Sequence, residues 1–390
     1  MNVLTLCRKD NLCKELWGYA RAFERQGVTL HCFDWGTPVN VDVRELLRNC
    51  PERPDFILNP ESGITFMPTN LTAVDVPTVC FHFDTYQATA RRIRWSMIYD
   101  IPVVFHPHFE EQYRRAGHPS PLTLAHAAPI DFYGGRNLEE HERTYEVGWV
   151  GRLNGAPYNA RRRILPALAS QFRMNDWQRT YKMEETADIY RQSKIIVNVS
   201  RDDYPQDANM RVYEAMAAGA LLMTRMPTDL SALGFVEGEH FIGYRDETEI
   251  IPAVRRWLAD EVGRARITAA ARGLVLAQHT YDARVKSLLE FIRDNGSKLT
   301  APARRWPESK VRLTYLDYYA GTSSMDCAHK EFRWIVRHSL VDALTGARIL
   351  VRASARQGLN RVAAWSQRRR VNDSGAERTM AQNITLDRPK

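Results

Sequence analysis

One carboxylate interrupts an otherwise apolar stretch, MRVYEAMAAGALLMT, at residues 210–224. At helical spacing Met210 belongs to a core-facing stripe, and Glu214, four residues later, lies on nearly the same face. Gly219 is expected to end the helix, and a buried strand is expected to follow it. Because a buried charge is costly unless something pairs with it, this pattern predicts a specific partner for the Glu214 carboxylate.

Two kinds of partner fit Glu214. The stretch SRDDYPQDAN leads from a strand into this helix, so the backbone N–H groups of Asn209 and Met210 would form an anion site at the helix N-terminus. Glu214, one turn further along, could then accept hydrogen bonds from a ribose. The alternative is an ion pair with Arg152 or Arg211 that only holds the core together. The residues alone leave both interpretations open.

A second polar group ends another strand, in CFHFDTYQ. His82 and Asp84 have period-two spacing, which places them on one face, and either could serve as a general base. A lone histidine on a strand is more often a core residue with satisfied hydrogen bonds. The shared face favours a polar site, and the core interpretation of His82 stays open beside it.

The elements that must position these residues alternate along the chain. Apolar runs predict strands at residues 2–7, 28–34, 55–59, 78–83, 102–106, 145–151, 194–200, 220–224 and 239–244. Helical periodicity predicts helices among them, at residues 14–26, 159–170, 184–192, 210–217 and 261–276. Strands this apolar, separated by helices, indicate parallel sheets covered on both faces. The sequence therefore predicts two doubly wound α/β domains that bind ligands at the carboxyl ends of their strands.

Composition indicates an ordinary globular chain of 390 residues, with 44% hydrophobic and 26% charged residues. Six scattered cysteines without zinc-site spacing favour reduced thiols in a cytoplasmic protein. The sequence shows no signal-peptide pattern and no apolar run near the ~20 residues of a membrane-spanning helix. We predict an N-terminal domain at residues 1–140, a nucleotide-binding domain at residues 141–295, and an extension at residues 296–390.

The helix of Glu214 also belongs to a longer pattern. NMRVYEAMAAGALLMT, with the downstream run from FIGYRDETEI to KSLLEFI, resembles the C-terminal domain of GT-B glycosyltransferases, and is similar to the group of the spore maturation protein CgeB. The resemblance is dense over residues 145–292 and looser over residues 1–132. It implies a GT-B fold, in which two Rossmann-like domains face a cleft, followed here by a mainly helical basic extension.

The resemblance assigns roles around the nucleotide. In related retaining enzymes the glutamate of the EAMA segment binds the ribose of the nucleotide-sugar donor, which implies that role for Glu214. A glutamate eight positions upstream contacts the donor sugar, and Gln206 stands there in this chain. Asn209 occupies the position of the family's glycine at the helix start, beside Met210.

Arginines are expected at the diphosphate. Arg152, in GWVGRLNGAPYNARRR, matches the arginine of the GRL strand end, and Arg161 is the candidate for the lysine that follows in the family. The planar fork of arginine suits a diphosphate because it donates two parallel charge-assisted hydrogen bonds. The alternative for the RRR run is a solvated helix face. His82 falls where the family has a cleft histidine, and Asp84 matches an aspartate of the CgeB-like group.

Together these features imply a metal-independent glycosyltransferase that moves a sugar, with retention, from a nucleotide diphosphate sugar to an unknown glycan, lipid or protein acceptor. The predicted catalytic residues are His82, Asp84 and Gln206; no metal site and no cofactor beyond the donor substrate are expected. One alternative keeps the fold for a nucleotide-sugar 2-epimerase. The other is a non-catalytic sugar-nucleotide-binding or assembly protein, because Gln206 weakens the donor site.

Two metal-like patterns are set aside. Asp202 and Asp203 look like the metal-binding pair of GT-A enzymes, but a surface loop fits the predicted GT-B fold better. His106, Pro107 and His108 precede two glutamates at the start of a helix, where capping and acceptor contact are expected rather than metal ligation.

The positive charge of the chain is concentrated in its last quarter. Residues 301–390 hold 17 Lys and Arg against 8 Asp and Glu, whereas the whole chain has a net charge of +8. Arginines alternate there at helical spacing with apolar residues (Trp334, Ile335, Leu340, Leu344 and Trp365), and the residues after about 372 are expected to be disordered. Such a helix fits an anionic membrane surface at the inner face of the membrane, or packing on the N-terminal domain. A nucleic-acid partner ranks third.

Overall fold

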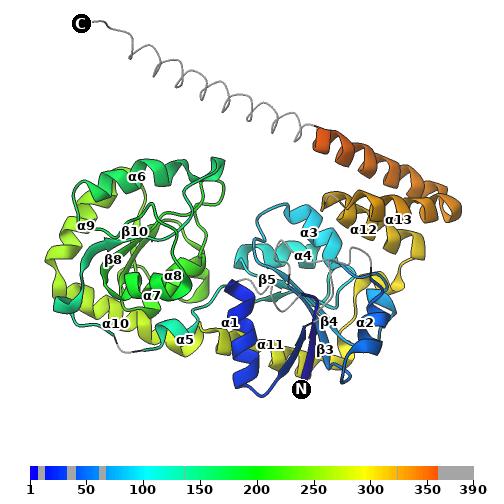
Figure 1. Ribbon diagram of the computed structural model, residues 1–390, viewed down its shortest axis with the longest axis horizontal. Helices are drawn as coiled ribbons and strands as arrows, with labels where there is room; N and C mark the ends of the chain where they lie inside the picture. Colours follow the sequence, from blue (N-terminus) through cyan, green and yellow to red (C-terminus); the bar gives the residue numbers. More distant parts are fainter. Residues whose placement is uncertain (8–13, 33–40, 61–66, 136, 323, 359–390) are drawn as a thin grey trace, which may run out of the picture. The chain divides into compact units, whose positions relative to one another are not determined.

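The computed structural model describes residues 1–7, 14–32, 41–60, 67–135, 137–322 and 324–358. The chain divides into two compact units, Met1–Arg304 and Arg305–Lys390. The first unit contains two parallel sheets with their covering helices, and the second is helical over its described residues (Figure 1). The tail residues 359–390, with Trp365 and the segment predicted to be disordered, lie outside the described residues.

The first sheet has the strand order β2-β1-β3-β4-β5-β6, and all its neighbours are parallel. Its strands are β1 (Asn2–Thr5), β2 (Thr29–Cys32), β3 (Phe56–Pro60), β4 (Thr78–His82), β5 (Ile101–Val104) and β6 (Leu122–Thr123). Every residue of β3, β4 and β5 is buried, as expected for strands covered on both faces. Five of these six strands coincide with predicted apolar runs; the two-residue β6 is too short to give a periodic signal.

Helices and single turns connect these strands. They are α1 (Lys14–Arg25), α2 (Val43–Asn49), η2 (Leu71–Ala73), α3 (Thr89–Ser96), η3 (Pro107–Phe109), α4 (Glu110–Arg115), α5 (Ile130–Tyr133) and η4 (Glu140–Glu142). A later helix, α11 (Tyr281–Asn295), lies beside α1 (Figure 1). Its apolar face, with Tyr281 and Val285, shares one core with Tyr19 of α1 and Phe81 of β4. The predicted boundary at residue 295 assigns α11 to the second domain, whereas its buried side chains belong to the first core.

The second sheet has the order β10-β9-β8-β7 and is also parallel throughout. Its strands are β7 (Tyr145–Gly148), β8 (Ser193–Asn198), β9 (Leu221–Arg225) and β10 (Ile242–Tyr244). The accompanying helices and turns are η5 (Ala156–Tyr158), α6 (Asn159–Ala169), α7 (Met183–Arg191), α8 (Met210–Ala217), η6 (Asp229–Leu233), η7 (Glu247–Glu249), α9 (Ile250–Ala259) and α10 (Glu261–Gln278). The turns η8 (Gly296–Lys298) and η9 (Pro302–Arg305) follow α11, and the backbone N–H of Ala303 donates to the Met97 carbonyl of the first-sheet domain.

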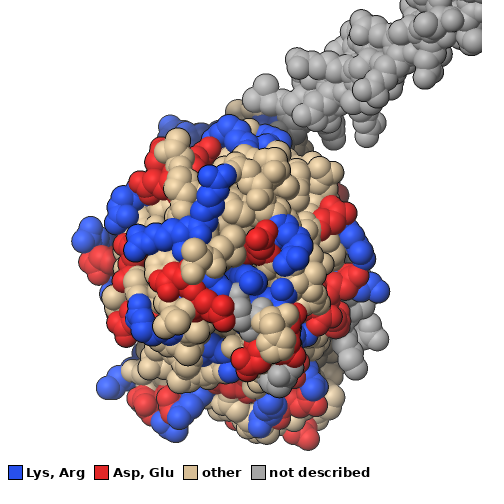
Figure 2. All heavy atoms as spheres, turned by 90° about the vertical axis from the view of Figure 1, so that its left-hand side faces the viewer, with Lys and Arg blue, Asp and Glu red and all other residues tan. Residues whose placement is uncertain are grey.

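Successive residues of β8 enter different cores, which confirms the doubly wound arrangement. Ile195 and Val197 pack in a cluster with side chains of α6 and α9. Ile196, between them, packs in a second cluster with side chains of α7, α8 and α10. Because neighbouring side chains of a strand point to opposite faces, the two groups of helices cover the two faces of the sheet. On the side of the molecule seen in Figure 2, basic and acidic side chains are interspersed.

Gly219 ends α8 as predicted. Its φ of +75° is in the left-handed region, which a glycine adopts without steric cost. A Cβ at this position would lie 2.0 Å from Oδ1 of Asn137, so the packing also excludes a side chain here. Arg143 donates to that Asn137 oxygen at 2.9 Å and to the Gly219 carbonyl at 2.9 Å. The linker after the first sheet is therefore fastened to the end of α8.

The second unit contains α12 (Glu308–Gly321), α13 (Met325–His338) and a helix over residues 340–358. Arg312 of α12 forms an ion pair of 2.9 Å with the buried Glu331 of α13. The helical prediction for the extension is confirmed over these residues. In the part of the chain that the structure describes, no helix is both long enough and apolar enough to cross a bilayer.

Candidate functional site

A pocket of about 460 Å³ opens at the carboxyl ends of strands from both sheets of the first unit. The loops after β7 and β8, together with α6, α7 and α8, form one side of it, and the other side comes from the loop after β4 and from His126. Ligands of parallel α/β sheets bind at this end of the strands. The topology therefore places the pocket where the sequence predicted a binding site.

Six of the eight predicted site residues line this pocket. They are Asp84, Arg152, Arg161, Asn209, Met210 and Glu214. The structure thus brings together side chains that are up to 130 positions apart in the chain, from Asp84 to Glu214. The remaining two, His82 and Gln206, lie elsewhere.

Asn209 is the N-cap of α8. Its side-chain oxygen accepts a hydrogen bond from the backbone N–H of Arg211 at 3.1 Å, which satisfies one of the free donors of the first turn. Its amide nitrogen lies 3.3 Å from Oδ1 of Asn198, at the end of β8. Asparagine therefore fixes the helix start to the strand before it, a role that the glycine of the related pattern could not perform.

Glu214 is only 2% exposed and lines the pocket one turn into α8. Arg211, one of its two predicted ion-pair partners, donates instead to the Val150 carbonyl at 2.9 Å and to Oδ1 of Asn198 at 2.8 Å. Burial, and after it the Glu214 charge, raise the pKa of Tyr133 well above its usual range. The Glu214 carboxylate therefore lines the pocket and also lies close enough to Tyr133 to disfavour ionisation of its phenol.

Only one residue of the RRR run points inward. Arg161 is buried, and it donates to the carbonyls of Val199 at 2.8 Å and Arg152 at 2.7 Å. Arg163 is exposed and forms an ion pair with Glu247, as a solvated helix face would. Burial, and then the charge of Arg211, lower the pKa of Arg161. An anion in the pocket would offset both effects, so the local electrostatics favour an anionic ligand.

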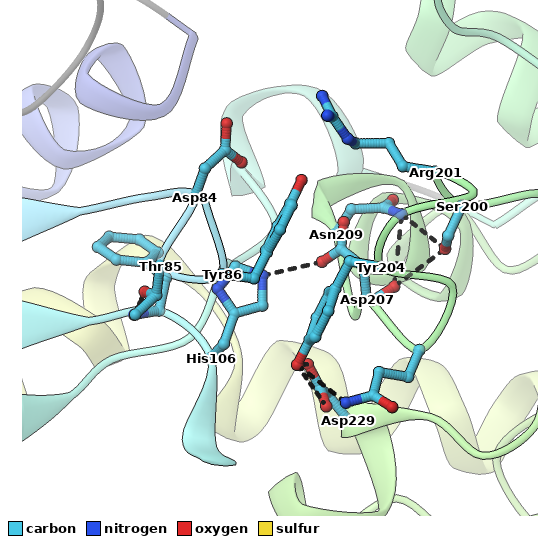
Figure 3. A network of polar contacts seen from close by, with 12 residues as sticks. Asp84, Thr85, Tyr86, His106, Ser200, Arg201, Tyr204, Asp207, Asn209 and Asp229 are labelled. Atoms are coloured by element: carbon cyan, nitrogen blue, oxygen red, sulfur yellow. Dashed lines mark hydrogen bonds and ion pairs between the residues drawn. The ribbon is translucent and has the colours of Figure 1, made fainter. Parts of the chain in front are cut away.

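A buried pair that the sequence analysis did not assign joins the two sides of the pocket. His106 Nε2, in the loop after β5, lies 3.1 Å from Oδ1 of Asp207, in the loop before α8 (Figure 3). Both side chains are less than a tenth exposed. The HPH pattern drew attention to His106, but we interpreted it as a helix-capping and acceptor-contacting segment. In the structure the His106 imidazole makes no capping hydrogen bond to η3. Only the tertiary structure brings Asp207 to it.

Aromatic rings surround this pair. Tyr86, after β4, and Tyr204, after β8, stack with centroids 4.5 Å apart and planes within 5°. His106 meets both rings edge-on, at 5.0 Å and 5.3 Å (Figure 3). Such contacts each add about 0.5–1.5 kcal/mol to the area that they bury. The stack therefore fixes the loops that carry Asp84 and Asp207 relative to each other.

Gln206 lies beside this stack rather than in the pocket. Its side-chain amide donates to the Tyr204 hydroxyl at 3.2 Å, and that hydroxyl donates to the buried Asp229 at 3.0 Å. His108 Nε2 also lies 3.3 Å from Asp229, whose carboxyl pKa is raised by burial. Gln206 is therefore part of a polar network next to the pocket, and the pocket-lining residue is its neighbour Asp207.

The predicted pair His82 and Asp84 is separated in the structure. His82 is buried, with its Nε2 at 3.6 Å from the Cys80 thiol and its ring 5.7 Å from that of Tyr113. Asp84 is exposed, lines the pocket and accepts from the Gln87 amide at 3.0 Å. The strand β4 ends at His82, so the period-two rule no longer applies two residues later.

The two metal-like patterns have other partners. The Asp202 carboxylate accepts from the backbone N–H groups of Asn159 and Ala160, at 2.7 Å and 3.2 Å, and so caps α6. Asp203 forms an ion pair with Arg201 at 2.6 Å. Over the described residues, no three His, Cys, Asp or Glu side chains are grouped so that they could hold a metal ion. Both aspartates therefore serve the loop that leads into the pocket.

The comparisons place the chain among proteins of one fold. Residues 138–290 match the model of a family described as glycosyl transferase-like, whereas no curated protein sequence is significantly similar to the chain. The structure of HepE from Anabaena with UDP-glucose is 12% identical, has a TM-score of 0.55, and covers 75% of this chain and 100% of its own.

Two further solved structures are similar to the chain over about the same share of its length. A glycosyltransferase from Rickettsia africae is 8% identical, with a TM-score of 0.53 and coverage of 75% of this chain and 98% of its own. A sucrose-phosphate synthase from Thermosynechococcus elongatus is 13% identical, with a TM-score of 0.51 and coverage of 76% and 100%. These likenesses confirm the predicted GT-B fold, while the narrower CgeB-like resemblance stays a prediction.

Proposed function

We propose that the protein is a glycosyltransferase that moves a sugar from a nucleotide diphosphate donor to an acceptor hydroxyl, with retention at the anomeric carbon. The observation that carries this proposal is the pocket. A buried carboxylate, inward-facing arginines and the N-terminus of α8 meet there, within the segment that matches the glycosyl transferase-like family. Acceptor identity, retention and metal independence go beyond the fold and are part of the proposal.

The second-sheet side of the pocket binds the donor in this proposal. Glu214 accepts hydrogen bonds from the ribose hydroxyls, and the exposed Arg152 binds the diphosphate with the N-terminus of α8. Arg161 acts mainly through Arg152, because it donates to the Arg152 carbonyl and so holds that loop in place. HepE has been crystallised with UDP and with UDP-glucose, which makes UDP-sugars the first donors to test.

In the proposed reaction, the main requirement is to stabilise the negative charge that develops on the leaving diphosphate. The bond between the anomeric carbon and the diphosphate oxygen breaks, and a bond to the acceptor oxygen forms on the same face. The acceptor proton passes to the leaving diphosphate, whose developing charge is stabilised by Arg152 and the helix N-terminus. Water is a competing acceptor, so exclusion of water from the pocket sets the ratio of transfer to hydrolysis.

Of the three predicted catalytic residues, we propose that only Asp84 lies beside the reacting sugar. It lines the pocket on the side opposite to Glu214, where an acceptor would enter. His82 and Gln206 do not line the pocket, and we assign them to the packing behind β4 and to the network of Tyr204. We expect Asp84→Asn to lower the rate of transfer at least tenfold while leaving donor affinity unchanged, because the Asp84 carboxylate would no longer orient the acceptor hydroxyl for attack.

A screen of nucleoside diphosphates and their sugars by thermal shift tests donor binding, because a ligand of the native state raises the melting temperature. The donor that binds is then incubated without acceptor. Slow release of free sugar supports a transferase, an epimerised donor would indicate the 2-epimerase, and binding without turnover would indicate the non-catalytic alternative. No shift with any nucleoside diphosphate would remove the proposal.

A further inference from the structure

The exposed aliphatic residues of the chain are concentrated in one short region. Five of the eight large hydrophobic side chains that are exposed in the described residues lie between residues 336 and 351. Three of them, Leu340, Leu344 and Val351, are 79%, 67% and 69% exposed. Because they are four and seven positions apart in a helix, they form one stripe, which we call the aliphatic stripe.

The opposite face of the same helix is packed with small residues. Ala343, Gly346 and Ala353 are buried, together with Leu350. A Cβ on Gly346 would lie 3.0 Å from the Phe332 ring and 3.3 Å from Leu316, so this face packs closely on α12 and α13. A helix of a soluble bundle normally buries its large aliphatic side chains. In this helix the buried face consists mostly of small side chains, and the aliphatic stripe is exposed to solvent. Such an exposed apolar surface is typical of a site that binds a protein or a membrane.

Positive charge runs beside the aliphatic stripe. Arg348, Arg352 and Arg356 are exposed and follow one another at four-residue spacing, so they form a second stripe on the adjoining face. Arginine side chains can lay their methylene stems along an apolar surface and keep the guanidinium at its polar edge. This pairing of an apolar face with flanking cations fits the boundary between acyl chains and anionic headgroups.

The arginine stripe also argues against two other binding partners for this face, a second copy of the chain and a nucleic acid. A symmetric dimer formed through the aliphatic stripe would bring two copies of the arginine stripe to the edges of one interface, where like charges repel. The outward residues of the stripe are aliphatic and not aromatic, so they offer no stacking platform for a nucleic acid base. An anionic lipid surface offers apolar acyl chains to the aliphatic stripe and negative phosphates to the arginine stripe.

We infer that the helix at residues 340–358 binds the surface of a membrane that contains anionic lipids. It lies in the plane of the interface, with the aliphatic stripe at the acyl boundary and the arginine stripe on lipid phosphates. None of the described helices is able to span the bilayer, so the attachment is peripheral. This inference concerns where the protein works and does not depend on the donor or the reaction.

Flotation of the full-length protein tests it. The vesicles are phosphatidylcholine alone or phosphatidylcholine with about one third phosphatidylglycerol. We expect flotation with the anionic vesicles only, and weaker flotation as salt is raised. The triple variant Leu340→Ser, Leu344→Ser and Val351→Ser should lower partitioning about tenfold or more, because it removes the buried apolar area. Val262→Ser is the matched control, since Val262 on α10 is 83% exposed but lies outside this helix.

A second variant separates the two stripes. Arg348→Gln, Arg352→Gln and Arg356→Gln together should abolish the preference for phosphatidylglycerol, because each arginine contributes through anionic headgroups. Circular dichroism establishes that both triple variants keep their helix content. The inference is overturned if the wild type does not float with anionic vesicles, or if the serine variant floats as well as Val262→Ser. It is also overturned if the wild type is a dimer that does not float and the serine variant is monomeric.

Discussion

Two buried glutamates stand on helices in different units of this protein, and they differ in what surrounds them. Glu331 of α13 is 1% exposed, and its carboxylate is held at 2.9 Å by Arg312 of the neighbouring helix. Glu214 of α8 is equally buried, but it lines a pocket at the carboxyl ends of the strands. In both cases one carboxylate interrupts the buried apolar face of its helix.

The comparison shows that the surroundings of a buried charge, and not its burial, separate a structural role from a binding role. Arg312 lies on the neighbouring helix α12, so its removal leaves the Glu331 carboxylate buried without this cation. Glu214, in contrast, lines the pocket at the carboxyl ends of the strands. We therefore expect substitutions in the first pair to affect folding, and substitutions around Glu214 to affect binding.

The largest effect is expected for Arg312→Ala. It leaves the Glu331 carboxylate buried without its cation, which should lower the free energy of unfolding of the helical unit by about 3 kcal/mol. Hydrogen exchange followed by mass spectrometry would show faster exchange in α12 and α13 and unchanged exchange in the two parallel sheets. Donor binding should not change. Equal destabilisation of both units would mean that the pair does not belong to the helical unit alone.

The second largest effect is expected on the affinity for the diphosphate group of the donor. Arg152→Ala should weaken binding of a nucleoside diphosphate by about 2 kcal/mol, roughly thirtyfold, because a hydrogen bond to a charged group is lost. Binding of the nucleoside without phosphate should be unaffected. Titration calorimetry with both ligands measures the difference, and Arg163→Ala is the control, because Arg163 is an exposed arginine on α6, the helix that follows the Arg152 loop. A loss of the same size for the nucleoside would contradict the phosphate role.

Glu214→Gln should have a smaller effect that is confined to the donor. The amide keeps the shape of the side chain but makes neutral hydrogen bonds, which are about half as strong, so donor affinity should fall by about 1 kcal/mol, roughly fivefold. Its melting temperature without ligand should match the wild type. Glu331→Gln is the matched control in the other unit, and we expect it to leave donor affinity unchanged. A large loss of stability in Glu214→Gln would return this residue to a structural role.

The smallest effect is a pH dependence of the helical unit. Burial, opposed in part by Arg312, raises the pKa of Glu331 above its usual value of 4.5. For a carboxyl group with a raised pKa in the folded state, the protonated form is favoured by folding, so this contribution is fully present below pH 4.5. It is lost as the pH rises through the folded-state pKa. Glu331→Gln should flatten this part of the stability–pH curve, and an unchanged slope would show that another group titrates there.

Sequence patterns predicted the parallel sheets because their signal is local. Apolar runs such as residues 194–200 fix β8, and the glycine at residue 219 fixes the end of α8. The second-sheet side of the pocket was also predictable, since Arg152 and Asn209 lie in the loops that follow two strands of one sheet, and Glu214 lies one turn into the helix after the second loop. Their position along the chain is enough to place them at one edge of that sheet.

The other side of the pocket was not predictable in this way. His106 and Asp207 come from loops of different sheets, 101 positions apart, and nothing in either local pattern indicates the other. The period-two rule grouped His82 with Asp84, but β4 ends between them, and strand length is set by pairing with the neighbouring strands. α11 likewise returns to the first core although it follows the second domain in sequence.

The sequence by itself therefore determined most of the strands, the parallel order of their connections, the Gly219 helix end and several residues that line the second-sheet side of the pocket. These follow from periodicity and from the geometry of a strand followed by a helix, which a short stretch of chain already contains. Only the tertiary structure decided which side chains meet across the pocket, and that Arg312 pairs with the buried Glu331. Those contacts depend on how separate elements pack, and packing between distant segments leaves no periodic trace in the chain.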